Sequence, residues 1–151
     1  MAVRYLTVSW DRLHRDACVL AGRLAARRPF AGIVAISRGG LVPAAILARE
    51  LDCRVVETVS VLTYDEEVRG TPRVVKSPVA AGDGTGWLVV DDLVDTGATA
   101  RLVRALLPGA YFVTIYAKPE GKALVDECVT DVSQDTWLVF PWDVVPQEDL
   151  S

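Results

Sequence analysis

The amino-acid sequence predicts an α/β fold with a mostly parallel central sheet flanked by helices. Short apolar runs rich in β-branched residues, which are typical of buried strands, alternate along the chain with segments whose apolar residues recur at helical spacing. Glycine-containing turns separate several of these runs from the helix that follows. Alternation of this kind implies parallel strands joined by right-handed crossovers.

The first half of the chain is predicted to form three strands and two helices. Tyr5–Trp10 alternates enough for a short strand, and Asp11–Arg27 places its leucines and alanines on one helical face. Ala31–Ile36 is an apolar, β-branched run that ends at a glycine turn. The helical stretch Leu41–Leu51 and a further strand, Arg54–Thr63, complete this half.

The second half begins with a long polar segment and then returns to the strand-and-helix pattern. Residues 64–86 are charged, rich in glycine and interrupted by two prolines, and a long stretch of this kind in a compact domain is typical of a functional lid or a disordered segment. Beyond it, Trp87–Val90 predicts a short strand, Thr99–Leu107 a helix and Phe112–Ala117 a buried strand.

The composition is that of a folded domain inside the cell. The 151 residues fit one domain, residues 1–151, and 51% of them are apolar and 24% charged. Mean hydropathy is +0.28, yet the longest apolar stretches, such as Leu41–Ala48, fall far short of the roughly 18 residues of a membrane-spanning helix. Met1–Trp10 lacks the pattern of a secretory signal peptide. We therefore expect a cytoplasmic protein without a transmembrane segment.

Charge and residue types exclude several classes of function. A net charge of −4 lacks the basic balance of a nucleic-acid-binding protein. The single histidine, His14, is predicted on a helix surface, which leaves no Ser-His-Asp triad or histidine metal site unless His14 joins it. Cys18, Cys53 and Cys128 are odd in number and are expected to be buried thiols. Neither a dinucleotide-binding glycine pattern nor a P-loop is present.

Polar residues and glycines follow three of the predicted strands. The turn Ser37–Gly40 follows the first long strand, Asp91 and Asp92 follow the strand at Trp87, and Lys118 follows the last one. Ligands of open α/β sheets bind beyond the carboxyl ends of the strands. The sequence therefore predicts one binding site at this edge of the sheet.

The clearest functional signal is the string Val89–Thr99, in which a strand leads through two carboxylates into a glycine turn that opens a helix. The amides of Thr96–Thr99 would face a phosphate at the helix start. Asp91 and Asp92 can accept hydrogen bonds from vicinal sugar hydroxyls and supply oxygen ligands to Mg2+. An acidic pair alone is more often a helix cap, but the whole string favours a site for a sugar phosphate and Mg2+.

In its context this string resembles the phosphoribosyl pyrophosphate motif of the type I phosphoribosyltransferases. The likeness covers about residues 5 to 143 and is to the bacterial xanthine-guanine branch of that family. Besides the string, it is carried by Val34–Pro43, Phe112–Pro119, Gln134–Trp137 and Pro141–Asp143. The resemblance implies a type I phosphoribosyltransferase-like fold with a mobile loop at about 64–86 and a small C-terminal hood over the base site at about 118–151.

The resemblance implies an enzyme of purine salvage. Such an enzyme transfers the 5-phosphoribosyl group from phosphoribosyl pyrophosphate to xanthine or guanine, and more weakly to hypoxanthine, giving XMP, GMP or IMP plus pyrophosphate. The implied cofactor is Mg2+, with Asp92 and Asp91 as metal ligands. Arg38 suits paired pyrophosphate oxygens. The implied phosphoribosyl pyrophosphate contacts are Ser37, Arg38, Gly39, Gly40, Arg69, Asp91, Asp92, Leu93, Val94, Asp95, Thr96, Gly97, Ala98 and Thr99.

The resemblance also implies the residues that contact the purine base. Asp95 would lie beside N7 as the acid/base candidate, and Lys118 would meet the 6-oxo group and reject adenine. Trp137 would stack on the base, while the backbone of Trp137 and Leu138, with Asp143, would read its 2-position. The implied catalytic residues are Asp95, Arg38 and Lys118.

Two alternatives remain open from the sequence. One is a regulator on the same fold that senses phosphoribosyl pyrophosphate or a nucleotide without turnover, against which the presence of Arg38, Asp95, Lys118 and Trp137 argues. The other is an enzyme that prefers hypoxanthine. The resemblance further implies a homotetramer and peripheral association with the cytoplasmic face of the inner membrane. Val144–Ser151 departs from the family's apolar ending and is predicted to be a loose terminus.

Overall fold

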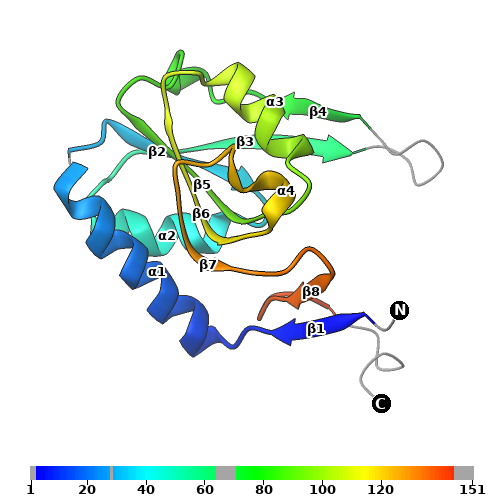
Figure 1. The fold of residues 1–151 in the computed structure, drawn as a ribbon. Helices are drawn as coiled ribbons and strands as arrows, with labels where there is room; N and C mark the ends of the chain where they lie inside the picture. Colours follow the sequence, from blue (N-terminus) through cyan, green and yellow to red (C-terminus); the bar gives the residue numbers. More distant parts are fainter. Residues whose placement is uncertain (1–2, 28, 64–70, 145–151) are drawn as a thin grey trace.

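The computed structural model describes residues 3–27, 29–63 and 71–144. The main sheet in these residues consists of β2 (Gly32–Ser37), β3 (Val56–Thr63), β4 (Pro72–Lys76), β5 (Trp87–Val94), β6 (Tyr111–Ala117) and β7 (Glu127–Asp131). The strand order is β4-β3-β2-β5-β6-β7 (Figure 1). Every pairing is parallel except that of the edge strand β4 with β3. The predicted mostly parallel α/β sheet is confirmed.

Helices cover both faces of the main sheet, with α1 and α2 on one side and α3 on the other (Figure 1). The helices are α1 (Trp10–Leu24), α2 (Leu41–Glu50), α3 (Ala98–Leu106) and the short α4 (Pro119–Lys122). Successive residues of β2 point to opposite faces of the sheet. Ile33 and Ala35 therefore join the core under α1 and α2, whereas Val34 and Ile36 join the core that contains Val103 of α3. Burial on both faces explains why β2 is a continuous apolar run.

Helix α1 begins where a serine hydroxyl caps its first turn. The side chain of Ser9 accepts a hydrogen bond from the backbone N–H of Arg12 at 3.1 Å. Trp10 therefore starts the helix, and the predicted strand Tyr5–Trp10 is too long, because strand β1 (Arg4–Thr7) ends before the cap. The buried face of α1 confirms the helical pattern read from the sequence; it consists of Leu13, Ala17, Leu20, Ala21 and Leu24.

A second, two-stranded sheet joins the two ends of the described chain. Strand β1 pairs in parallel with β8 (Thr136–Val139), and we call this pair the small sheet. Behind it Phe140 stacks on Trp142 with ring centroids 5.0 Å apart, and Trp142 meets Trp10 edge-on at 5.9 Å. Phe140 also lies 5.8 Å from the fully buried ring of Tyr116 on β6. These aromatic contacts attach the small sheet to the main sheet.

Strand β5 is longer than the sequence pattern predicts. The predicted strand Trp87–Val90 continues to Val94, because β6 pairs with it as far as Ala117. Asp91 and Asp92 therefore lie within the strand and not after it. Pairing with a neighbouring strand overrides the polarity that made the strand look finished.

The segment 64–86 is more regular than its composition indicates. Residues 64–70 lie outside the described part of the chain, but 72–76 form β4 and 79–81 form a 3-10 turn. The prediction of an irregular stretch is wrong there. Proline at the first position and charged residues along β4 are typical of an edge strand, and such a strand carries only a weak apolar signal.

The remaining residue-type predictions are partly confirmed. His14 is exposed, as expected, whereas Cys18, Cys53 and Cys128 are free thiols that are half-buried and not fully enclosed. No helix in the described part of the chain is both long and apolar enough to span a bilayer.

Candidate active site

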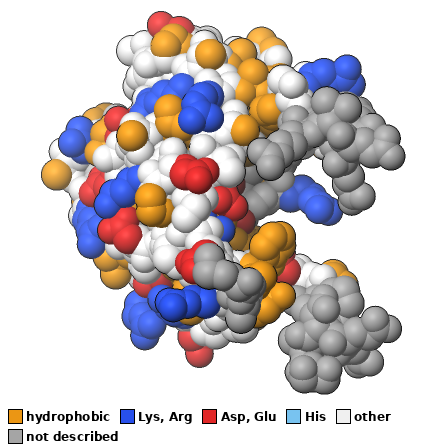
Figure 2. Space-filling view, turned by 45° about the vertical axis from the view of Figure 1, so that its right-hand side comes forward, with side chains coloured by type: hydrophobic (Ala, Val, Ile, Leu, Met, Phe, Trp, Pro, Cys, Tyr) orange, Lys and Arg blue, Asp and Glu red, His pale blue; other side chains and the backbone are white. Residues whose placement is uncertain are grey.

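Two adjoining clefts open at the carboxyl ends of β2 and β5. The large cleft, of about 1360 Å³, lies between these strand ends and the small sheet. The small cleft, of about 720 Å³, lies at the start of α3 and reaches the end of β3. Asp91 and Thr99 line both clefts, so the two clefts adjoin at these residues. Figure 2 shows acidic and hydrophobic side chains gathered around a hollow of the molecule.

Most of the site residues predicted from the sequence line one of these clefts. Ser37, Arg38, Gly39, Asp92, Trp137, Leu138 and Asp143 line the large cleft. Leu93, Val94, Asp95, Thr96, Gly97 and Ala98 line the small one. Gly40 is buried at the start of α2, and Lys118 is buried behind Asp95, so neither forms a cleft wall. Arg69 lies outside the described residues.

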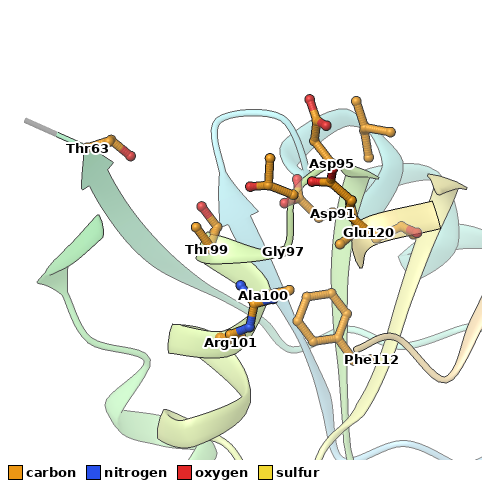
Figure 3. A pocket seen from close by; sticks show the side chains of 14 residues that line it. Thr63, Asp91, Asp95, Gly97, Thr99, Ala100, Arg101, Phe112 and Glu120 are labelled. Atoms are coloured by element: carbon orange, nitrogen blue, oxygen red, sulfur yellow. The ribbon is translucent and has the colours of Figure 1, made fainter. Parts of the chain in front are cut away.

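The small cleft is built around the turn between β5 and α3. Figure 3 shows Asp91, Asp95 and Thr99 around it. Gly97 precedes the helix with φ of 94°, a backbone conformation that favours glycine, and no side chain caps the helix start. The first N–H groups of α3 are therefore available to an anion, and the helix dipole favours negative charge at the same point.

The turn after β2 packs directly against the acidic pair. A Cβ on Gly39 would lie 2.5 Å from a carboxylate oxygen of Asp92, and a Cβ on Gly40 would overlap the carbonyl oxygen of Val90. Glycine at both positions lets the turn approach β5 this closely. Arg38 in this turn is exposed and lines the large cleft beside Asp92.

The acidic pair is held in a partly enclosed environment that disfavours negative charge. Asp91 accepts the backbone N–H of Asp92 at 2.9 Å, and Asp92 accepts that of Leu93 at 2.7 Å. Burial, together with the charge of Asp92, raises the pKa of Asp91 well above its usual range. Burial also raises the pKa of Asp92, and the nearby carboxylate of Asp143 adds to this effect. Hydroxyl donors or a cation bound here would relieve the repulsion.

In the absence of divalent cations, Asp91→Asn is expected to raise the melting temperature at neutral pH by several degrees. Because the pKa of the Asp91 carboxyl is higher in the folded than in the unfolded chain, the folded protein binds more protons between these two pKa values. The stability that the protonated Asp91 carboxyl contributes is therefore fully present below about pH 4. It is lost as the pH rises through the pKa that this carboxyl has in the folded protein. Asparagine keeps a side-chain oxygen that can accept the backbone N–H of Asp92, but it carries no charge.

Thermal unfolding with a chelator present, from about pH 4 to about pH 8, measures this effect. The matched control is Asp135→Asn, because a hydrogen bond from Ser133 lowers the pKa of Asp135, and this variant should not gain stability. A lower melting temperature of Asp91→Asn at neutral pH would contradict the assigned electrostatics.

A buried lysine and a glutamine amide hold the Asp95 carboxylate. Lys118, whose side chain is 5% exposed, lies with Nζ 3.2 Å from Asp95 Oδ2. Gln134 donates from Nε2 to Asp95 Oδ1 at 2.8 Å. Strand β6 positions the lysine, since the N–H of Lys118 bonds the carbonyl of Val94 at 2.9 Å. The group combines one carboxylate with two donors at the edge of the small cleft.

The small sheet forms the wall of the large cleft opposite the strand ends. Trp137 is 62% exposed there, which is high for a large aromatic side chain, whereas the neighbouring Leu138 is buried. Asp143 lines the same cleft, and its carboxylate accepts the backbone N–H of Phe140 at 2.8 Å. Trp142 packs in the aromatic stack and also lines the large cleft.

Sequence reasoning assigned no role to several residues that contribute to the site, among them Gln134, Tyr5 and Val61. Gln134 contacts Asp95 from a position 39 residues away in the chain, and Tyr5 and Val61 line the large cleft from β1 and β3. The local sequence carries no signal for these contacts, because each depends on how distant segments meet. Only the tertiary fold reveals them.

Comparisons with known proteins identify close relatives. The model of the phosphoribosyl transferase domain family matches residues 13–149. The xanthine-guanine phosphoribosyltransferase of Gluconobacter oxydans is 61% identical over 147 residues, which are 95% of this chain and 88% of that protein. The protein of the same name from Desulfotalea psychrophila is 54% identical over 145 residues, covering 95% and 89%. Among solved structures, a purine phosphoribosyltransferase from Pyrococcus horikoshii superposes with a TM-score of 0.80 at 27% identity, covering 94% of this chain and 95% of that one.

Proposed function

The chain belongs to the phosphoribosyl transferase domain family, and we propose that it is a purine salvage enzyme that transfers the 5-phosphoribosyl group of phosphoribosyl pyrophosphate to xanthine or guanine. Hypoxanthine is a weaker acceptor, and pyrophosphate is released. The observation that carries the proposal is the meeting of an open helix start and an acidic pair in two adjoining clefts, with Lys118 buried behind the cleft-lining Asp95. Relatives named xanthine-guanine phosphoribosyltransferase are 54–61% identical over 90–95% of the chain.

The small cleft would hold the sugar phosphate. The N–H groups of Thr96–Thr99 and the two threonine hydroxyls are donors suited to a 5-phosphate. Asp91 and Asp92, whose pKa values are raised by burial, would accept the vicinal ribose hydroxyls. Arg38 and the backbone from Ser37 to Gly40 would bind the pyrophosphate, since a guanidinium matches paired phosphate oxygens.

The purine would lie where the two clefts adjoin, with Trp137 of the large cleft on one side and Asp95 of the small cleft on the other. The exposed indole of Trp137 offers a flat stacking surface, and Leu138 and Asp143 would face the 2-position. Lys118 would donate to the 6-oxo oxygen. Adenine presents a donor at that position, and a lysine cannot accept from it, so oxopurines are favoured.

The reaction would be a direct displacement at C1 of the ribose. The bond from C1 to the pyrophosphate oxygen breaks, and a bond from C1 to a ring nitrogen of the base forms, while Asp95 beside N7 accepts or shares the proton that the base gives up. Charge that develops on the sugar and the leaving group would be stabilised by the amides of the phosphate turn and by Arg38.

Mg2+ is the proposed cofactor, and the residues present fit it. Asp91 and Asp92 supply oxygen ligands in a partly buried pocket that disfavours two uncompensated charges. Mg2+ prefers few carboxylates and completes its coordination with water and substrate oxygens. When bound, the ion would neutralise pyrophosphate charge.

Other features remain proposals that rest on the resemblance. Residues 1–151 would act as one domain, in which the small sheet forms the hood over the base; of the predicted mobile loop 64–86, residues 72–76 and 79–81 belong to β4 and a 3-10 turn, and Arg69 lies outside the described residues. We propose a cytoplasmic homotetramer, with peripheral association at the inner membrane face. Size-exclusion chromatography with light scattering tests the assembly, and membrane fractionation tests the association.

Assays with four bases test the function. The purified protein is incubated with phosphoribosyl pyrophosphate, Mg2+ and xanthine, guanine, hypoxanthine or adenine, and nucleotide and pyrophosphate are quantified. We expect turnover of xanthine and guanine, weaker turnover of hypoxanthine and little of adenine. Absence of turnover with intact binding of phosphoribosyl pyrophosphate would favour the non-catalytic sensor, an alternative to which the enzyme names of the relatives give no support.

A further inference from the structure

A single side-chain amide connects three segments of the site. Gln134 donates from Nε2 to Asp95 Oδ1 at 2.8 Å, and its Oε1 accepts the backbone N–H of Glu120 at 3.1 Å. Lys118 occupies the other oxygen of Asp95, Oδ2, at 3.2 Å. Each oxygen of the Asp95 carboxylate therefore has its own donor, and Gln134 reaches from the β5–α3 turn to the first turn of α4.

The orientation of this amide is determined by its neighbours. The N–H of Glu120 can only donate, so it must face the Gln134 oxygen, and the ionised Asp95 carboxylate can only accept, so it must face the Gln134 nitrogen. The reversed amide would place donor against donor and acceptor against acceptor. Gln134 is thus a fixed donor to Asp95.

Asp95 needs such a partner because its side chain is 49% exposed. With Lys118 alone, the carboxylate could turn about its side-chain bonds while keeping one hydrogen bond. A second donor on the other oxygen fixes the plane of the carboxylate. The direction in which its remaining lone pairs point is then fixed as well. A displacement of a reacting group by about 1 Å can lower the reaction rate strongly.

The same residue lies three positions before Trp137, the proposed stacking surface. The turn that carries Gln134 is anchored on both sides, since Val132 donates to the carbonyl of Ala117 at 2.9 Å and Thr136 donates to that of Ser133 at 3.1 Å. The amide of Gln134 therefore links the Asp95 turn to the segment that leads into β8.

We propose that Gln134 is a positioning residue, which aligns the Asp95 carboxylate with the purine and keeps it in register with the Trp137 surface. This role rests on the proposed function. Gln134 itself acts through Asp95.

Steady-state kinetics with guanine and saturating phosphoribosyl pyrophosphate test this role. Gln134→Ala should lower kcat about 10- to 100-fold and leave the KM for phosphoribosyl pyrophosphate nearly unchanged. Gln134→Glu, which keeps the length but replaces the donor with a second carboxylate, should be at least as impaired. At high enzyme concentration, Gln134→Ala should add little to the loss in Asp95→Asn, because the amide then has no carboxylate to align.

The control variant is Ser133→Ala, which removes hydrogen bonds to Asp135 and Thr136 in the same turn without touching Asp95. We expect it to stay near the wild-type rate. An equal loss in Ser133→Ala, an unchanged kcat in Gln134→Ala, or fully multiplicative losses with Asp95→Asn would overturn the positioning role alone. Absence of wild-type turnover with every base would overturn the proposed function and this role with it.

Discussion

Asp95→Asn is expected to lower kcat for guanine and xanthine by roughly 100- to 10,000-fold, the range of a lost general acid or base. Asparagine has nearly the same shape but cannot take a proton from the purine at neutral pH. Binding of phosphoribosyl pyrophosphate should change little, because the helix-start amides and the acidic pair remain. Initial rates give kcat, and isothermal titration calorimetry gives the affinity.

The matched control is Asp131→Asn. Asp131 also pairs with a lysine, with Lys122 Nζ 2.7 Å from its Oδ1, but this pair is exposed and lines neither cleft. The control should keep its rate. If Asp95→Asn lost less than about tenfold, Asp95 would not be the proton acceptor.

Gly39→Ala is expected to reduce kcat/KM for phosphoribosyl pyrophosphate by about 100-fold or more. The new methyl group would lie 2.5 and 2.6 Å from the two Asp92 carboxylate oxygens, so either the turn or the carboxylate must move. Both belong to the proposed site for the pyrophosphate, the ribose and the metal. The loss should appear mainly in KM, while circular dichroism shows a retained fold.

Gly22→Ala is the control for this substitution. Gly22 lies in α1, and an added Cβ would contact no atom within 4 Å. Alanine in a helix interior is more stable than glycine by up to about 1 kcal/mol, so this variant should keep its activity and gain stability. An unchanged kcat/KM in Gly39→Ala would show that the turn and the acidic pair do not act together.

The sequence predicts those parts of the fold that depend on buried apolar runs. Strands β2 and β6 and helix α3 carry their own periodicity, since each buries one or two faces against a neighbour. Strand β4 and strand β8 of the small sheet lacked such a signal. Strand β8 has one buried residue, Leu138, beside the exposed Trp137, and it forms because β1 supplies its partner.

The candidate site also combines features that local sequence patterns predict with contacts that only the tertiary fold brings together. The string from Val89 to Thr99 is local, so its strand, acids and helix start could be read together. The alignment of Asp95 by Gln134 joins residues 39 positions apart and depends on where the β5–α3 turn meets the segment before β8. The place of Lys118 behind Asp95 also comes from the tertiary fold, because the sequence indicates a strand end but not the depth of burial.

The most direct test of the account is a crystal structure of the protein with bound GMP, the proposed product of guanine. We expect the phosphate on the N–H groups of Thr96–Thr99 and the ribose hydroxyls at Asp91 and Asp92. The guanine should lie on Trp137 with its 6-oxo oxygen within hydrogen-bonding distance of Lys118. A phosphate bound at the Arg38 turn, or a base that does not stack on Trp137, would contradict the proposed site.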